Sequence, residues 1–164
     1  MATEEKWQGK ASAKVPGVSP EKVWAVLEDY GNVHKYLPSL DATALDFGEP
    51  GKLGCVRVCS GPPLPGAQDR AFTHEKLVVY DPANRTLSYE VTENNIGFKD
   101  FVATHKVVAE EDGSSSIEWS FVTPPMDSPF WSVEKIMGYI GYSVNHMAQT
   151  IAKESYEKIT EINF

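Results

Sequence analysis

The spacing of apolar and polar positions differs from one part of the chain to another, and these differences predict where its strands and helices lie. Residues 6–15 have the pattern of a strand, which Pro16-Gly17 ends. Ser19-Pro20-Glu21 has the residue types of a helix start: a capping serine, a proline in the first turn and an acidic residue after it. This helix is expected to end at Gly31, and a second short helix is predicted over 32–37.

A long run of strand-like segments follows, and turn-forming Gly, Pro, Asn and Asp residues separate them. Short turns between consecutive strands favour antiparallel pairing. We therefore expect one antiparallel sheet that contains the first strand and six more, over 40–47, 54–60, 72–80, 86–93, 98–109 and 115–123.

The last part of the chain has a helical period. Ser128-Pro129 predicts another helix start, and apolar residues then recur at three- and four-residue spacing as far as Ile159. Such a helix is about 45 Å long, and the sheet is the partner available to cover its apolar stripe. Gly138 and Gly141 lie mid-helix, where they either permit a bend or close contact or leave room for a ligand. The pattern predicts an α+β fold in which a curved seven-stranded sheet surrounds a long C-terminal helix and leaves an internal cavity.

Composition narrows the possible functions. The chain has 164 residues, 41% of them apolar, and a formal net charge of −8. One domain over 1–164 is expected, with its core at about 6–162. The acidic balance and the lack of Lys/Arg clusters argue against nucleic acid or an anionic membrane as partner. The sequence has no apolar run of about 18 residues and no basic, apolar leader, so a cytoplasmic protein is expected.

Two cysteines and a few histidines offer little metal or nucleophilic chemistry. Cys55 and Cys59 are four residues apart in a predicted strand, a separation of about 13 Å that is too long for a disulfide. No histidine pair has metal-ligand spacing, so neither a metal nor a cofactor is expected. Gly-x-Ser-x-Gly and phosphate-binding glycine loops are absent from the sequence.

Six segments, spread over residues 7–121, carry a resemblance to a known family. They are Trp7-Gln8-Gly9-Lys10, Lys35-Tyr36-Leu37-Pro38-Ser39-Leu40, Gly54-Cys55-Val56-Arg57-Val58, Phe72-Thr73-His74-Glu75-Lys76-Leu77-Val78, Gly97-Phe98-Lys99-Asp100-Phe101 and Ile117-Glu118-Trp119-Ser120-Phe121. The chain resembles the lachrymatory-factor synthase branch of the plant START and birch-pollen-allergen superfamily, also called polyketide cyclase and lipid transport. The resemblance extends from about Trp7 to Ile159 and implies a helix-grip fold. Most members of that superfamily bind small molecules without transforming them.

The resemblance also implies functional residues. In that family a cavity arginine and glutamate, assisted by tyrosine hydroxyls, rearrange an alkenyl sulfenic acid to a thial S-oxide without a cofactor. These positions fall on Arg57, Glu75 and Tyr89, which become the candidate catalytic residues. A second family tyrosine is replaced by Phe101, which removes one hydroxyl donor.

Strand alternation gives an independent view of these residues. Glu75 shares a side with Leu77, which favours the concave face, whereas both sides of the Arg57 strand are partly apolar. If both face the cavity, the guanidinium can bind a polar oxygen and the carboxylate can move a proton. The alternative is an ordinary cross-strand ion pair or two solvated charges. Tyr89 either donates to a ligand or belongs to the core.

A glycine- and proline-rich loop over 60–66 resembles the gate loop of abscisic-acid receptors. It is either a lid with Leu64 at its tip or a plain surface loop; the His-Arg-Leu latch of those receptors is missing. We expect a small hydrophobic ligand or substrate, converted by a cofactor-free isomerase or lyase. The alternatives are a carrier or sensor of a hydrophobic metabolite, lipid or plant hormone, and a protein-interaction module that docks through this loop. The residues expected to line the ligand site are Leu64, Leu77, Phe101, Trp119, Phe121, Gly138 and Tyr142.

Overall fold

A computed structural model describes residues 5–162 of the chain. The strands and helices are β1 (Trp7–Val15), α1 (Pro20–Glu28), η1 (Tyr30–Tyr36), β2 (Ala42–Phe47), β3 (Val56–Gly61), β4 (Ala71–Asp81), η2 (Pro82–Asn84), β5 (Thr86–Asn94), β6 (Phe101–Ala109), β7 (Ser115–Thr123) and α2 (Val133–Ile162). This order is the predicted α+β helix-grip arrangement.

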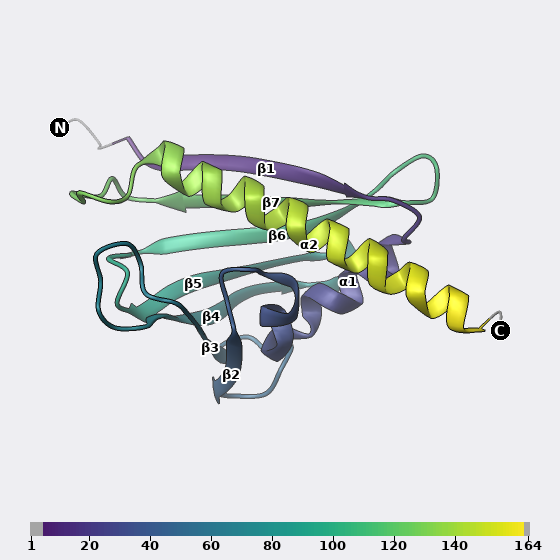
Figure 1. Ribbon diagram of the computed structural model, residues 1–164, viewed down its shortest axis with the longest axis horizontal. Coiled ribbons are helices and arrows are strands. Elements are labelled where there is room, and N and C mark those ends of the chain that lie inside the picture. Colours follow the sequence, from purple (N-terminus) through teal and green to yellow (C-terminus); the bar gives the residue numbers. More distant parts are fainter. Residues whose placement is uncertain (1–4, 163–164) are drawn as a thin grey trace.

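The seven strands form one antiparallel sheet in the order β1-β7-β6-β5-β4-β3-β2. The meander from β2 to β7 therefore pairs neighbours in sequence, and β1 joins the end of the sheet beside β7. Figure 1 shows the long helix α2 lying across one face, and this face is the concave one that holds the core.

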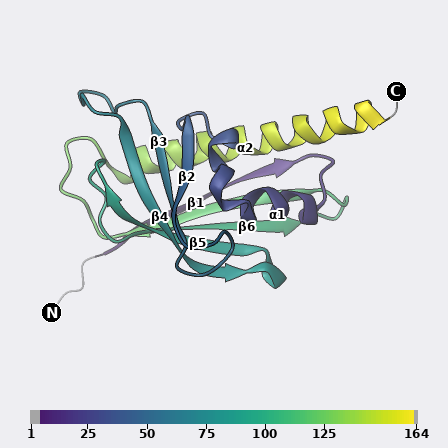
Figure 2. The ribbon, with the colours of Figure 1, turned by 90° about the horizontal axis from the view of Figure 1, so that it is seen from below.

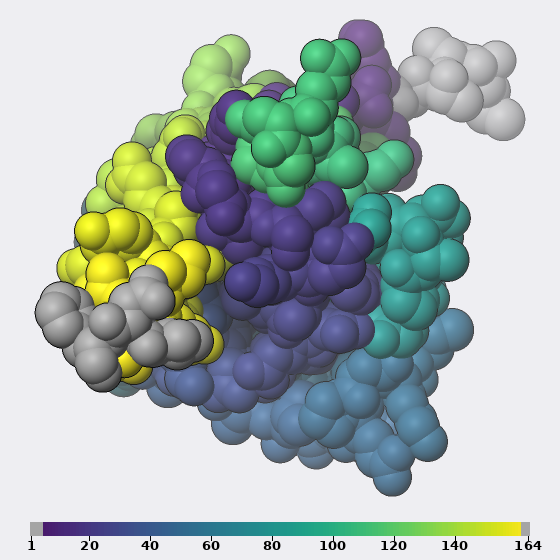
Figure 3. All heavy atoms as spheres, turned by 90° about the vertical axis from the view of Figure 1, so that its right-hand side faces the viewer, coloured from purple at the N-terminus to yellow at the C-terminus, as the bar shows by residue number. Residues whose placement is uncertain are grey.

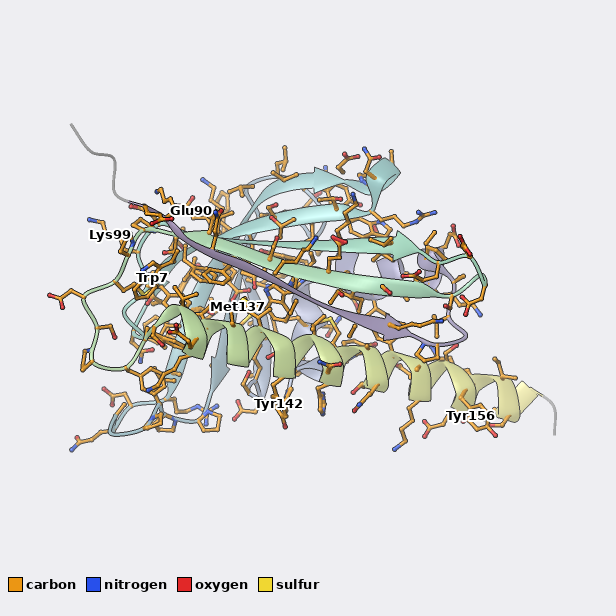
Figure 4. All side chains as sticks on the ribbon, turned by 90° about the horizontal axis from the view of Figure 1, so that it is seen from above. Trp7, Glu90, Lys99, Met137, Tyr142 and Tyr156 are labelled. Atoms are coloured by element: carbon orange, nitrogen blue, oxygen red, sulfur yellow. The ribbon has the colours of Figure 1, made fainter. Side chains whose placement is uncertain are left out.

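Helix α2 packs mainly against β1 and β7. Gly9 of β1 permits a close approach, because a Cβ at this position would collide with the side chain of Met137, which Figure 4 shows on the sheet side of the helix. The last turns of α2 project past the sheet (Figures 1 and 2) and are largely exposed.

The short helices close one end of the space between α2 and the sheet. Ser19 caps α1 as expected, its Oγ accepting from the backbone N–H of Lys22 at 3.4 Å. The helix ends at Glu28, before the predicted stop at Gly31, and η1 then begins at Tyr30. Figure 3, seen from the C-terminal end of α2, shows residues of α1 filling this end of the molecule.

Two predicted boundaries were wrong because side chains satisfy backbone groups locally. Ser128 does not begin α2: its Oγ accepts from the N–H groups of Phe130 and Trp131 in a turn. Ser132 caps the helix instead, accepting from Lys135 N–H at 3.2 Å. Strand β6 begins three residues later than expected, because Asn94 holds the preceding turn through hydrogen bonds to residues 96 and 98.

Candidate functional site

A cavity of about 350 Å³ lies between the concave face of the sheet and α2. Its walls are mostly aliphatic and aromatic, and its mouth is formed by the loops after β3, after β5 and before α2. Trp131 joins two of these loops, since its Nε1–H donates to the carbonyl of Ile96 at 2.8 Å. The mouth residues are Pro62, Leu64, Ile96, Phe98, Phe130, Trp131 and Lys135.

Arg57 and Glu75 line this cavity from neighbouring strands. They are directly opposite in the register of β3 and β4, and Arg57 Nε donates to Glu75 Oε1 at 2.8 Å. The residues are 2% and 9% exposed, so the ion pair is buried rather than solvated. Of the two orientations that the alternation left open, the structure therefore has the inward one for Arg57.

Aromatic rings hold the guanidinium in place. Arg57 Cζ lies 3.9 Å from the ring centre of Tyr30 and 4.9 Å from that of Tyr89. A second guanidinium nitrogen, Nη1, donates to the backbone carbonyl of Tyr30 at 3.2 Å. Cation–π contacts and these hydrogen bonds fix the direction of a side chain that would otherwise be mobile.

Two hydrogen-bond donors at the cavity have no partner among the described residues. Arg57 Nη2 and the Tyr89 hydroxyl make no hydrogen bond to any residue in 5–162, and both residues line the cavity. Burial alone would lower the pKa of Arg57, but the adjacent Glu75 carboxylate raises it, so the guanidinium stays charged. Burial raises the pKa of Tyr89 well above its ordinary value, so its hydroxyl stays a donor. Two donors are therefore available to a ligand in the cavity.

The second carboxylate oxygen of Glu75 also has a protein partner. The Thr73 hydroxyl donates to Glu75 Oε2 at 2.9 Å, and the Tyr30 hydroxyl donates to the Glu75 backbone carbonyl at 2.9 Å. The neighbouring Cys59 thiol is neutral, because burial raises its pKa far above the ordinary range. The carboxylate thus has one strong ionic partner and one hydroxyl that can rotate away.

His105 lies in the cavity wall between Tyr89 and Trp119, at ring-centre distances of 5.6 and 4.4 Å. It is buried, and its Nε2 has no hydrogen-bond partner among residues 5–162. Burial, reinforced by the charge of Arg57, lowers its pKa from 6.5 to about 3, so the imidazole is neutral. His105 is therefore an uncharged part of the cavity wall.

Comparisons with known proteins agree with this architecture. The sequence profile of the family described as polyketide cyclase / dehydrase and lipid transport matches residues 6–149. The chain belongs to this family.

Solved structures with low sequence identity to this family member have the same fold. XoxI from Bacillus cereus is 19% identical, with a TM-score of 0.70 over 90% of this chain and 94% of its own. Major latex-like protein 151 from Panax ginseng is 16% identical, with a TM-score of 0.70 over 91% of this chain and 97% of its own.

Within this family member, the predicted ligand-site residues divide into two groups. Leu64, Phe101 and Trp119 line the cavity, whereas Leu77 and Phe121 are buried in the core beside it and do not line it. Phe121 stacks on Phe101 at 5.6 Å and so supports the wall from behind.

The two helix residues expected at the ligand lie on the outer face of α2. Tyr142 is 65% exposed, and Figure 4 shows it directed away from the sheet. Gly138 is exposed and does not line the cavity, so it makes no room for a ligand there. A Cβ at this position would meet nothing within 4 Å, so the glycine does not permit a close contact either. Both assignments were wrong, because the apolar stripe that faces the sheet runs through Ile136 and Ile140 and leaves 138 and 142 on the opposite side.

Sequence reasoning missed Tyr30, Thr73 and Tyr139. Tyr30 lies in η1, where no strand alternation assigns a face, although it makes closer contact with Arg57 than Tyr89 does. Thr73 shares its strand side with Glu75, and that alternation was the available signal. Tyr139 lines the cavity from α2 and hydrogen-bonds Ser39 at 3.0 Å across it.

No three His, Cys, Asp or Glu side chains within 5–162 are grouped so as to hold a metal ion. In the same range, no helix is long and apolar enough to span a membrane.

Proposed function

We propose that this protein binds a small, mostly apolar molecule in its internal cavity, with one oxygen of that molecule held by Arg57 and Tyr89. The observation that carries the proposal is the buried guanidinium, which keeps a free N–H face toward an apolar space. Arg57 Nη2 and the Tyr89 hydroxyl have no hydrogen-bond partner within residues 5–162, so a ligand oxygen that enters the cavity can accept from them. The family and the cavity volume support a ligand-binding protein.

We further propose that Glu75 moves a proton on the bound molecule, as in the lachrymatory-factor synthase reaction. Arg57 and Tyr89 would bind the oxygen of an alkenyl sulfenic acid, and Glu75 would accept its O–H proton. The electron pair of that bond then forms S=O, the C=C pair shifts to C=S, and the alkene carbon that is not bonded to sulfur takes the proton back from Glu75. The step needs no cofactor, and the Glu75 carboxylate is regenerated.

Replacement of Glu75 by Gln tests this step, because it keeps the shape of the side chain and removes the proton acceptor. The substrate is an alkenyl sulfenic acid released in situ by a cysteine sulfoxide lyase, and the product is detected by gas chromatography. We expect thial S-oxide above the lyase-only control with the native protein and its loss in Glu75→Gln. Far-ultraviolet circular dichroism verifies that the variant is folded. Unchanged turnover in a folded variant would refute the catalytic role.

A non-catalytic carrier or sensor of a hydrophobic metabolite, lipid or plant hormone is the second candidate. The observation that favours it is Phe101, which stacks between Phe98 at 4.4 Å and Phe121 at 5.6 Å and offers no hydroxyl. Mass spectrometry of organic extracts of the purified protein tests it. A carrier releases the same compound before and after incubation, whereas an enzyme releases a converted one. A cytoplasmic setting fits the free, buried thiols of Cys55 and Cys59.

A further inference from the structure

Charge is distributed unevenly between the closed end of the cavity and its mouth. At the closed end, Arg57 and Glu75 neutralise each other at 2.8 Å. At the mouth, Lys135 in the first turn of α2 lines the cavity, with its Nζ 4.2 Å from the ring centre of Phe130. Within residues 5–162, no carboxylate lies within 4.0 Å of this ammonium group.

The closed end does not suit an anionic group. A second negative charge beside Arg57 would also lie close to the Glu75 carboxylate, in a region from which water is largely excluded. Like charges at such separations repel strongly when the local dielectric constant is low. The deep position therefore suits an uncharged acceptor oxygen, such as that of a ketone, ester or sulfoxide.

The mouth of the cavity, in contrast, suits an anionic group. The chain carries a net charge of −8, and several of its other cationic side chains, among them Lys14, Arg70 and Arg85, are paired with carboxylates. Lys135 instead rests on an aromatic ring, which positions its charge without neutralising it. The backbone N–H groups at the start of α2 add to the positive potential there.

We propose that the ligand is an anionic amphiphile, whose apolar body fills the cavity and whose anionic group binds Lys135 at the mouth. This inference rests on the proposed ligand-binding function in its carrier form and names the chemical class of the carried ligand. An alkenyl sulfenic acid, which has a single polar group, is not of this class. A cavity of about 350 Å³ is near the lower end of ligand-site volumes, which suits a single chain or one ring system rather than a two-chain membrane lipid.

Two fluorescent probes that differ by one group provide the test. Anilinonaphthalene sulfonate and N-phenylnaphthylamine have the same aromatic body, and only the first has a sulfonate. Both are titrated into the native protein, into Lys135→Gln and into Lys153→Gln. Lys153 is exposed on the same helix, so its substitution removes the same charge away from the mouth.

We expect Lys135→Gln to weaken sulfonate binding about threefold to fivefold, the effect of one partly exposed ion pair, and to leave the uncharged probe unchanged. Lys153→Gln should leave both affinities unchanged. Added salt should weaken only the sulfonate probe, because screening acts on charge. Equal effects of the two lysine substitutions would overturn the assignment of the anion to Lys135.

A cavity-blocking variant separates this inference from the function on which it rests. Ala71→Trp places a large side chain in the cavity wall near the mouth. If the native protein binds neither probe, or if Ala71→Trp binds both as tightly as the native protein does, the cavity is not the binding site and the proposed function fails. If Ala71→Trp loses both probes while Lys135→Gln changes neither, ligand binding stands and the anionic class is wrong.

Discussion

Removal of one partner of the Arg57–Glu75 pair should destabilise the protein far more than removal of both. The two atoms in contact are 2.8 Å apart, and both residues are almost fully buried. At an effective dielectric constant of about 20, their attraction is about 6 kcal/mol, much of which offsets the cost of burying the charges. Glu75→Leu leaves a buried guanidinium without its counter-ion.

Single substitutions at buried pairs typically cost about 3–5 kcal/mol. We take about 3 kcal/mol, the lower end of this range, for Glu75→Leu and for Arg57→Met, because each remaining charge keeps a hydrogen bond. After Glu75→Leu the guanidinium still donates to the Tyr30 carbonyl, and after Arg57→Met the Glu75 carboxylate still accepts from Thr73. The double variant replaces both charges with apolar side chains of similar size and should lie within about 2 kcal/mol of the native protein.

Urea unfolding followed by tryptophan fluorescence measures these differences. With a slope of about 2 kcal/mol per molar urea, each single variant should lower the midpoint by about 1.5 M, and the double variant by less. The slope itself should not change, since the folded state keeps its surface. Single losses below about 1 kcal/mol, or a double loss equal to the sum of the single losses, would refute the buried-pair reasoning.

Three further predictions concern groups around the site. Tyr30→Phe removes the 2.9 Å hydrogen bond to the Glu75 carbonyl and should cost about 1 kcal/mol, seen as a melting temperature about 2–4 °C lower. Gly61→Ala places a Cβ against the backbone carbonyl oxygen of Ser39 and should cost about 1–3 kcal/mol by urea unfolding; a smaller loss would mean that this segment shifts freely. His105 has its pKa lowered by burial from 6.5 to about 3, so the unfolded chain takes up a proton at higher pH than the folded one. Stability should therefore fall by up to about 1.4 kcal/mol per pH unit below 6.5, and the native protein should lose about 2 kcal/mol more than His105→Phe between about pH 7 and pH 5. Parallel losses in the two proteins would contradict this pKa.

The fold was largely predictable because its elements depend on local patterns. Alternation and turn residues located the strands, and a three- to four-residue period located α2. The errors lie at element ends, where one side chain decides between two local structures. Ser128 and Ser132 are both capable caps, and only the turn made by Trp131 and its neighbours shows which one begins the helix.

The site was less predictable, because it depends on distances between elements. Strand alternation predicts that Glu75 faces the concave side of the sheet. No pattern in the sequence places η1 over Arg57, so the contact between Tyr30 and Arg57 could not be predicted. Gly138 lies on the exposed face of α2, so its missing side chain does not indicate space for a ligand. A helical period fixes which residues share a side, and here the buried neighbours Ile136 and Ile140 already place position 138 outside.

The stability of variants at Arg57 and Glu75 indicates whether these charges serve folding or ligand recognition. If two apolar side chains at positions 57 and 75 give a protein of comparable stability, folding alone does not account for the charges. Their cost is then offset by what they recognise, and the free Arg57 N–H groups and the Tyr89 hydroxyl, from two residues that line the cavity, are the groups available for it. The double variant Arg57→Met/Glu75→Leu should therefore remain folded and keep the apolar part of the cavity, yet lose preference for ligands with an acceptor oxygen. The double variant would then lose ligand recognition and keep its stability. A single substitution at this pair lowers the stability as well, so it cannot distinguish the two roles.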